Sequence, residues 1–174
     1  MISPALMSSA RTASGRDDWQ TPPHVLDLVR QVAPIALDPC TDECNPTGAA
    51  SFVYRPDGDG LAFSWIDSDL DPGLVYVNPP YSKIRTWLGK CAEEGRLGVE
   101  IIALVPARTD TRAWHDSASR ADAICFWRGR LTFVGATAGA PFPSALLYWG
   151  ERSKRFHDVF RAHGQILYTL KGTR

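Results

Sequence analysis

The sequence lacks a long hydrophobic run: no stretch approaches the roughly eighteen apolar residues that a membrane-spanning helix needs. Residues 1–16 contain Ser, Ala, Gly and Arg without sustained apolar periodicity, and the continuous apolar stretch of a signal peptide is missing there. We therefore expect a flexible leader over residues 1–16, and a soluble, cytoplasmic protein with no membrane partner.

Cysteine is scarce and net charge is zero. Cys40 and Cys44 form a C-x3-C pair, Cys91 and Cys125 lie far apart, and no second Cys/His pair follows at ligand spacing. Reduced thiols and no metal site are expected. Lys and Arg total 19, as do Asp and Glu, so the whole molecule has no electrostatic attraction for nucleic acid. This balance counts against a protein that coats DNA.

Charge is nevertheless uneven along the chain. Residues 151–174 contain six Lys or Arg against two acids. This basic C-terminal extension is expected to pack on the main domain, and its charges either meet phosphates or form a solvated helix face, which is the commoner role of a charge run. A chain of 174 residues with 44% hydrophobic content suits one domain, which we expect over residues 17–150.

Helix and strand patterns alternate after the leader. Thr21-Pro22 is typical of a helix start, and the apolar run at 35–37 stops at Asp38-Pro39 like a buried strand. The sequence predicts an α/β fold whose mostly parallel sheet is covered by helices and ends in an antiparallel hairpin. The expected strands are 35–37, 51–54, 74–77, 99–105, 123–127 and 144–149, and the expected helices begin near Thr21, at Ser82 and at Asp110 or Thr111.

The tetrapeptide Asn78-Pro79-Pro80-Tyr81 directly follows the strand at 74–77. Asn78 and Pro79 each precede a proline and are pushed to extended angles, while the two prolines have no N–H. The side-chain carbonyl of Asn78 and the backbone carbonyl of Pro79 are therefore acceptors for something outside the segment. A plain Pro-Pro turn is the structural alternative. The position at the carboxyl end of a strand, where α/β sheets bind ligands, favours function.

The tetrapeptide resembles the (D/N)-P-P-(Y/F) signature of the amino-methyltransferases, which is shared with enzymes that methylate cytosine N4, glutamine or RNA. The ordered set of motifs around it resembles the phage-type DNA N6-adenine methyltransferases. That set is Trp19-Gln20-Thr21-Pro22, Leu37-Asp38-Pro39-Cys40, Asp59-Gly60-Leu61 with Trp65, 129–133 and 141–144. The resemblance implies a Rossmann-like methyltransferase sheet, S-adenosylmethionine as cofactor and DNA as partner. It also implies a monomer or weak dimer in a bacterial cell, encoded by the host, a phage or a prophage.

In such an enzyme Asn78, Pro79, Pro80 and Tyr81 are the catalytic residues. The N6 amine of adenine is a poor nucleophile, so two acceptors aimed at its protons would free its lone pair for in-line attack on a methyl sulfonium. Tyr81 would stack on a base flipped out of the duplex. Three further substrate contacts are expected: Phe142 as a second ring face for the base, and Arg108 and Arg130 as phosphate contacts. Arginines on a protein surface are common, so the alternative for Arg108 and Arg130 is an exposed side chain without a binding role. Trp87, Trp127 and Trp149 are expected in the core.

The resemblance also assigns cofactor contacts. Asp38, with Pro39 and Cys40, matches the cofactor-binding loop, and Thr21-Pro22 matches the motif that contacts the methionine part. Asp59 is expected to accept from the cofactor adenine with Leu61 packed on that ring, or equally to be a turn residue. The usual G-x-G after the first strand is absent. Two other functions stay open: methylation of a different amine, in protein glutamine, RNA or cytosine N4, and a non-catalytic nucleic-acid-binding module.

Overall fold

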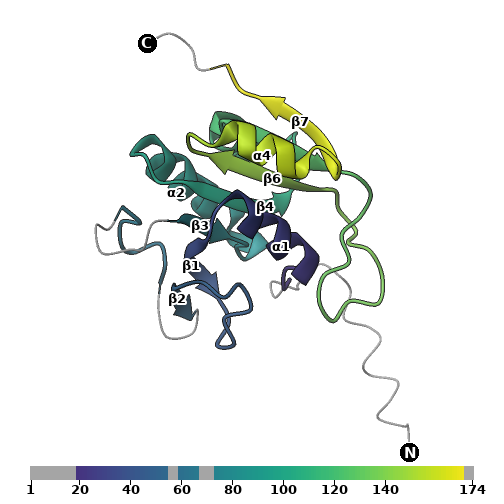
Figure 1. Ribbon diagram of the computed structural model, residues 1–174, viewed down its shortest axis with the longest axis horizontal. Coiled ribbons are helices and arrows are strands. Elements are labelled where there is room, and N and C mark those ends of the chain that lie inside the picture. The colour runs from purple at the N-terminus through teal and green to yellow at the C-terminus, as the bar shows by residue number, and fades with distance from the viewer. Residues whose placement is uncertain (1–18, 55–58, 67–72, 171–174) are drawn as a thin grey trace, which may run out of the picture.

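The computed structural model describes residues 19–54, 59–66 and 73–170, and Figure 1 shows their arrangement. The predicted leader at 1–16 lies outside the described residues. Within these ranges no helix has the length and apolar character needed to cross a membrane.

Seven strands form one sheet in the order β2-β1-β3-β4-β6-β5-β7. The neighbours from β2 to β4 are parallel, whereas β6 runs antiparallel to β4 and β5, and β7 antiparallel to β5. The predicted α/β fold, with a sheet that starts parallel and becomes antiparallel, is confirmed. The strands are β1 (Ile35–Thr41), β2 (Ser51–Tyr54), β3 (Leu74–Val77), β4 (Ile101–Pro106), β5 (Ala123–Trp127), β6 (Ser144–Trp149) and β7 (Gly164–Tyr168).

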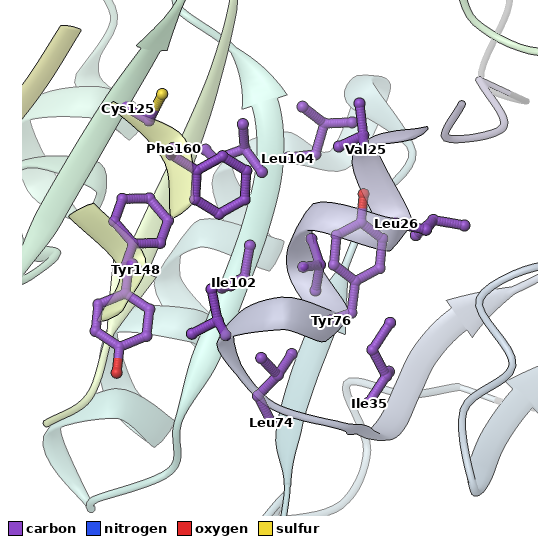
Figure 2. Packing of buried hydrophobic residues seen from close by; sticks show 14 of the residues in the cluster. Val25, Leu26, Ile35, Leu74, Tyr76, Ile102, Leu104, Cys125, Tyr148 and Phe160 are labelled. Carbon is purple, nitrogen blue, oxygen red and sulfur yellow. The ribbon is translucent and has the colours of Figure 1, made fainter. Parts of the chain in front are cut away.

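Helices cover both faces of the sheet (Figure 1). They are α1 (Pro23–Val32), α2 (Ile84–Arg96), α3 (Arg112–Asp116) and α4 (Ser153–Phe160), with 3-10 turns η2 (Tyr81–Lys83) and η3 (Ala118–Arg120). Because side chains alternate along a strand, β3 sends Leu74 and Tyr76 to one core and Val75 and Val77 to the other. Figure 2 shows the first core, which α1 and α4 cover; α2 and α3 cover the second.

Several predicted boundaries are wrong. Strand β4 spans Ile101–Pro106 and not 99–105, and α2 begins at Ile84, with Lys83 and not Ser82 at its N-cap. Helix α1 begins at Pro23, and Thr21 does not cap it, because the Thr21 hydroxyl is hydrogen-bonded to the Tyr76 hydroxyl at 2.8 Å. Strand β1 does not stop at Asp38-Pro39 but continues to Thr41. A register shift between Asp38 and Thr41 interrupts the pairing with β2, and such irregularities tolerate a proline inside a strand.

The chain after Trp149 forms helix α4, where a helix face is one of the two expected roles of its charges, and strand β7, which was not predicted. Helix α4 buries Phe156 and Phe160 completely, and its Lys154 and Arg155 are exposed. Strand β7 adds to the sheet beside β5 but buries only Gly164. An edge strand with so little burial lacks the apolar alternation by which strands are found in a sequence.

The sheet has one edge at which β1, β2, β3, β4 and β5 all end. Because β6 and β7 are antiparallel to these strands, they begin at the same edge, where Ser144 pairs with Pro106 and Gly164 with Trp127. We call this the carboxyl edge.

Candidate active site

Asn78 occupies the centre of a hydrogen-bond network at the carboxyl edge. Its Nδ2 donates to the backbone carbonyl of Trp19 and, at 3.0 Å, to Oγ1 of Thr21. Its Oδ1 accepts from the Tyr81 hydroxyl at 3.2 Å. Thr21 is bonded in turn to Tyr76. The network thus joins residues almost sixty positions apart in the sequence.

These partners decide which way the Asn78 amide faces. A backbone carbonyl can only accept, so the nitrogen must face Trp19 and the oxygen must face Tyr81. An amide oxygen has two lone-pair sites, and Tyr81 occupies one of them. The second remains for a donor such as an amine.

The segment that holds Asn78 is itself anchored on both sides. The Gln20 carbonyl accepts from the Val134 backbone N–H at 3.1 Å, and the Gln20 side chain donates to Asp42 just after β1. The Trp19 ring packs at 5.1 Å from Phe133 and 5.5 Å from Phe142, between ring centroids. The Trp19-Gln20-Thr21 segment therefore links the end of β1, the end of β3 and the loop between β5 and β6.

Both tyrosines of the network are held neutral. Burial raises the pKa of Tyr76 well above its usual value, although the hydrogen bond with Thr21 opposes that shift. Burial also raises the pKa of Tyr81. Tyr81 therefore keeps its proton and acts as a hydrogen-bond donor, not as a base.

A pocket of about 330 Å³ opens beside Asn78. It lies at the small end of the range of ligand pockets. Of the residues expected to bind cofactor it contains Thr21, Asp38 and Cys40, and Pro22 and Pro39 are their chain neighbours. The full lining is Trp19, Gln20, Thr21, Asp38, Cys40, Thr41, Asp42, Pro46, Thr47, Tyr76, Asn78, Val134 and Gly135.

The polar groups of this pocket are mainly acidic or hydroxylic. Asp38 is 3% exposed, with Oδ1 accepting from the Cys40 N–H at 3.0 Å. Asp42 supplies a second carboxylate. The Thr41 hydroxyl is buried and has no hydrogen-bond partner among the described residues. The pocket therefore suits a cationic ligand with further groups that can bond to a hydroxyl. Within the described part of the chain, no group of His, Cys, Asp and Glu is arranged to hold a metal ion.

A second hollow, of about 60 Å³, lies at the Tyr81 end of the tetrapeptide. Tyr81 and Arg108 both line it, together with Thr111 and Trp114. Asn78 lines the large pocket and Tyr81 lines the small one, so the two ends of the tetrapeptide contact different hollows.

The two remaining expected substrate contacts are placed differently. Phe142 is 9% exposed and meets Tyr81 edge-on, with ring centroids 5.4 Å apart and planes at 84°. Because the two rings are nearly perpendicular, Phe142 does not offer a face parallel to that of Tyr81. Arg130 is exposed on the β5–β6 loop and lines neither hollow.

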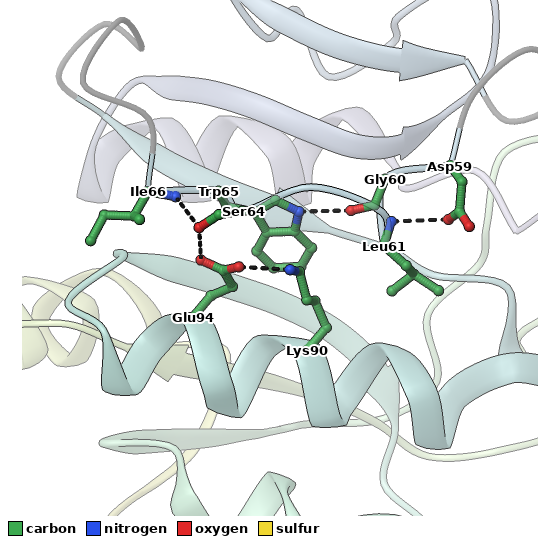
Figure 3. Close-up of polar contacts among 8 residues, drawn as sticks. All are labelled: Asp59, Gly60, Leu61, Ser64, Trp65, Ile66, Lys90 and Glu94. Carbon is green, nitrogen blue, oxygen red and sulfur yellow. Dashed lines mark hydrogen bonds and ion pairs between the residues drawn. The ribbon is translucent and has the colours of Figure 1, made fainter.

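The loop with Asp59 and Leu61 touches β1 but lines neither hollow (Figure 3). Oδ1 of Asp59 accepts from the Leu61 N–H at 3.0 Å, which is a turn contact. Gly60 packs so closely that a Cβ there would overlap the Pro39 carbonyl oxygen.

Helix α2 holds that loop in place. Glu94, which is 2% exposed, accepts from Ser64 at 3.2 Å and forms an ion pair with Lys90 at 2.7 Å. The Trp65 indole N–H donates to the Gly60 carbonyl at 2.8 Å. The loop is thereby fixed against the end of β1 (Figure 3).

The sequence model of one protein family matches residues 8–145, and that family is described as DNA N-6-adenine-methyltransferase (Dam). The chain belongs to the Dam family. It is therefore an enzyme of the class that methylates adenine N6 in DNA, and the predicted resemblance is confirmed. Dam methyltransferases generally use S-adenosylmethionine. No curated protein and no solved structure gives a significant match.

Several residues of the site were not singled out from the sequence of this Dam-family enzyme. Tyr76 precedes Asn78 by two positions in an extended segment, so strand alternation alone puts both on one side, and that signal was available. Thr41 and Asp42 were missed because β1 was expected to end at Asp38-Pro39.

Proposed function

We propose that this Dam-family enzyme transfers a methyl group from S-adenosylmethionine to N6 of an adenine flipped out of DNA, by direct in-line attack beside Asn78. The cofactor takes the pocket of about 330 Å³, and the base takes the side of Tyr81. The orientation of the Asn78 amide carries the proposal, because its oxygen is the group that faces the Tyr81 side.

The chemistry of the pocket fits the cofactor. S-adenosylmethionine supplies an electrophilic methyl group on a sulfonium and carries an ammonium group. Two carboxylates, Asp38 and Asp42, match these positive charges, and a buried carboxylate is best satisfied by a cation. Thr21 and Asp38 hold the methionine part, and the unpartnered Thr41 hydroxyl gains a partner.

The tetrapeptide activates the amine. Oδ1 of Asn78 and the backbone carbonyl of Pro79 each accept a hydrogen bond from one N–H of the N6 amine. These bonds favour a pyramidal nitrogen with a free lone pair. The nitrogen would form its bond to the methyl carbon as the bond between that carbon and the sulfonium sulfur breaks, which leaves a neutral thioether. The methylated nitrogen would then lose one proton to solvent. Neutral Tyr81 orients Oδ1 through its hydroxyl and presents its ring to the base.

The base side must widen before a purine can enter, because a hollow of about 60 Å³ is well below ligand-pocket size. Arg108 and Thr111 lie on the β4–α3 loop, which bounds the hollow. We expect this loop to move when the base enters.

Methyl transfer with isotope-labelled cofactor to unmethylated plasmid DNA tests the function. Nucleoside digestion should recover the label as N6-methyladenine, and Asn78→Ala should recover almost none. Label recovered as N4-methylcytosine, in RNA or in protein glutamine would replace adenine with that acceptor. Binding of DNA without any transfer would leave a non-catalytic module.

A further inference from the structure

The carboxyl edge carries exposed basic residues that line neither hollow, and one of them, Arg130, is expected from the sequence to contact phosphate. Arg128 and Arg130 follow β5, and Arg161 follows α4; all three are exposed. Half-buried His163 lies between Arg161 and β7. We call these three arginines with His163 the β5–β7 basic surface.

The topology brings these residues together although thirty positions separate them. Trp127, the last residue of β5, pairs with Gly164, the first of β7, and the Arg128 N–H donates to the His163 carbonyl at 2.9 Å. The ring of His163 stacks on the ring of Trp127, with centroids 5.4 Å apart and planes at 13°. The ring of His24, at the start of α1, lies 6.1 Å from the Trp127 ring. Trp127, expected in the core, is only half-buried and joins three segments here.

This surface lies on the same edge of the sheet as the active site, with β4 and β6 between β3 and β5. Strands β3 and β5 end at the same edge, and the loop after β5 is bonded through Val134 to Gln20, next to the residues that hold Asn78. In Figure 1 the green β5–β6 loop lies beside the beginning of α1.

The surface is basic without compensating acids. No Asp or Glu occurs between residues 123 and 149 or between 159 and 170. Among the described residues none of its three arginines forms an ion pair, whereas Lys90, Arg152 and Lys154 elsewhere are paired with Glu94, Glu100 and Asp158. Its guanidinium groups can therefore bind an anion without first breaking an ion pair to any described residue.

We infer that the β5–β7 basic surface binds the phosphate backbone of the DNA that flanks the methylated adenine. The inference rests on the proposed function, since DNA must be the substrate. A molecule with zero net charge has no overall attraction for DNA, so a local surface has to provide it. Exposed arginines without ion pairs suit phosphates, which they bind in bidentate fashion.

The test compares two triple variants of the full chain. Arg128→Gln, Arg130→Gln and Arg161→Gln remove the surface. Arg96→Gln, Arg120→Gln and Lys154→Gln remove as many cations from positions outside it, so net charge is matched. The affinity for a DNA duplex is measured between 50 and 200 mM salt, a range in which phosphate binding dominates the change.

The slope of log K against log salt is negative, and each phosphate that an arginine neutralises makes it steeper by about 0.9. We therefore expect the magnitude of the slope to decrease by about 2 to 3 in the first variant. The control should keep the wild-type slope, and both variants should keep the wild-type cofactor affinity and unfolding midpoint. A wild-type slope in the first variant overturns the inference, as does an equal fall in both. Absence of methyl transfer by wild-type protein that binds DNA refutes the proposed function instead, so the two failures are distinct.

Discussion

The two halves of the carboxyl edge have opposite charge. At the end of β1, Asp38, Asp42 and Glu43 lie within six residues that include no Lys or Arg. At the ends of β4 and β5, Arg108, Arg128 and Arg130 are exposed; Asp110 is the one acid in the loop after β4, and no acid occurs from 123 to 149. Zero net charge is a sum over the whole chain, so it says little about what each half of this edge binds.

The opposite charge of the two halves suits a reaction between partners of opposite charge. On the proposed function the methyl donor is a cation and the acceptor belongs to a polyanion, so an evenly mixed edge would weaken both interactions. Asn78 lies on the boundary, with its nitrogen held by the 19–21 segment and its oxygen turned toward Tyr81. Changes in each half should therefore affect one partner and spare the other.

The largest effect is expected at the boundary. Asn78→Ala should lower the single-turnover rate of methyl transfer about 100-fold or more, because it removes an acceptor that is needed mainly in the transition state. Affinities for cofactor and DNA, measured by calorimetry and by fluorescence anisotropy, should stay close to wild type. Near-normal turnover of this variant would remove Asn78 from the mechanism.

The next largest effect is expected from a change in the acidic half, which should lower cofactor affinity alone. Asp38→Ala should weaken S-adenosylmethionine binding by about 10- to 100-fold, the scale of a hydrogen bond to a charged group, and leave DNA affinity unchanged. Asp38→Asn is the matched control, because it keeps an oxygen for the Cys40 N–H and removes only the charge. Calorimetry of both folded variants measures the difference. Unchanged cofactor affinity in Asp38→Ala would refute the assignment.

The strands were predictable where a short run is bounded by clear end signals. Strands β2, β3, β5 and β6 have the predicted bounds, and β3, β5 and β6 are apolar runs followed by Asn78, Arg128 and Gly150. Strand β4 is fully buried but lies one to two residues further along the chain than predicted. The end of β1 was not predictable, since local rules count Asp38-Pro39 as a stop and only the register shift allows the strand to pass it. Strand β7 was missed because its stability comes from pairing with β5.

The site was predictable only in its local part. The tetrapeptide is identified by four adjacent residues and by its position after a strand. The contacts of Asn78 with Trp19 and Thr21 span more than fifty residues, and no local pattern encodes them. Spacing also could not reveal that Phe142 meets Tyr81 edge-on, since ring geometry depends on how β3 and the β5–β6 loop pack.

A smaller effect is expected on the base side of the boundary. Tyr81→Ala should lose about 1–3 kcal/mol of base stacking, a 10- to 100-fold loss in productive DNA binding. Tyr81→Phe keeps the ring and removes one neutral hydrogen bond to Asn78, about 0.5–1.5 kcal/mol, so most activity should remain. Fluorescence of 2-aminopurine at the target position should be brighter with the Ala variant, whose extruded base cannot restack. Equal inactivity of the two variants would make the hydroxyl the functional group.

The smallest effect concerns a single charge in the basic half. Arg108→Ala should lower the salt slope of DNA binding by about 0.9 and weaken binding several-fold, as expected when one phosphate is no longer neutralised. The turn itself should survive, because the bonds from Thr111 end on the backbone carbonyl of Arg108 and not on its side chain. Arg112→Ala is the matched control: it is also exposed, four residues along, and does not line the hollow beside Tyr81. Cofactor affinity should be unchanged in both. If both variants change the slope equally, Arg108 contributes no more to DNA binding than another exposed arginine. The loop beside Tyr81 would then not be a specific phosphate contact.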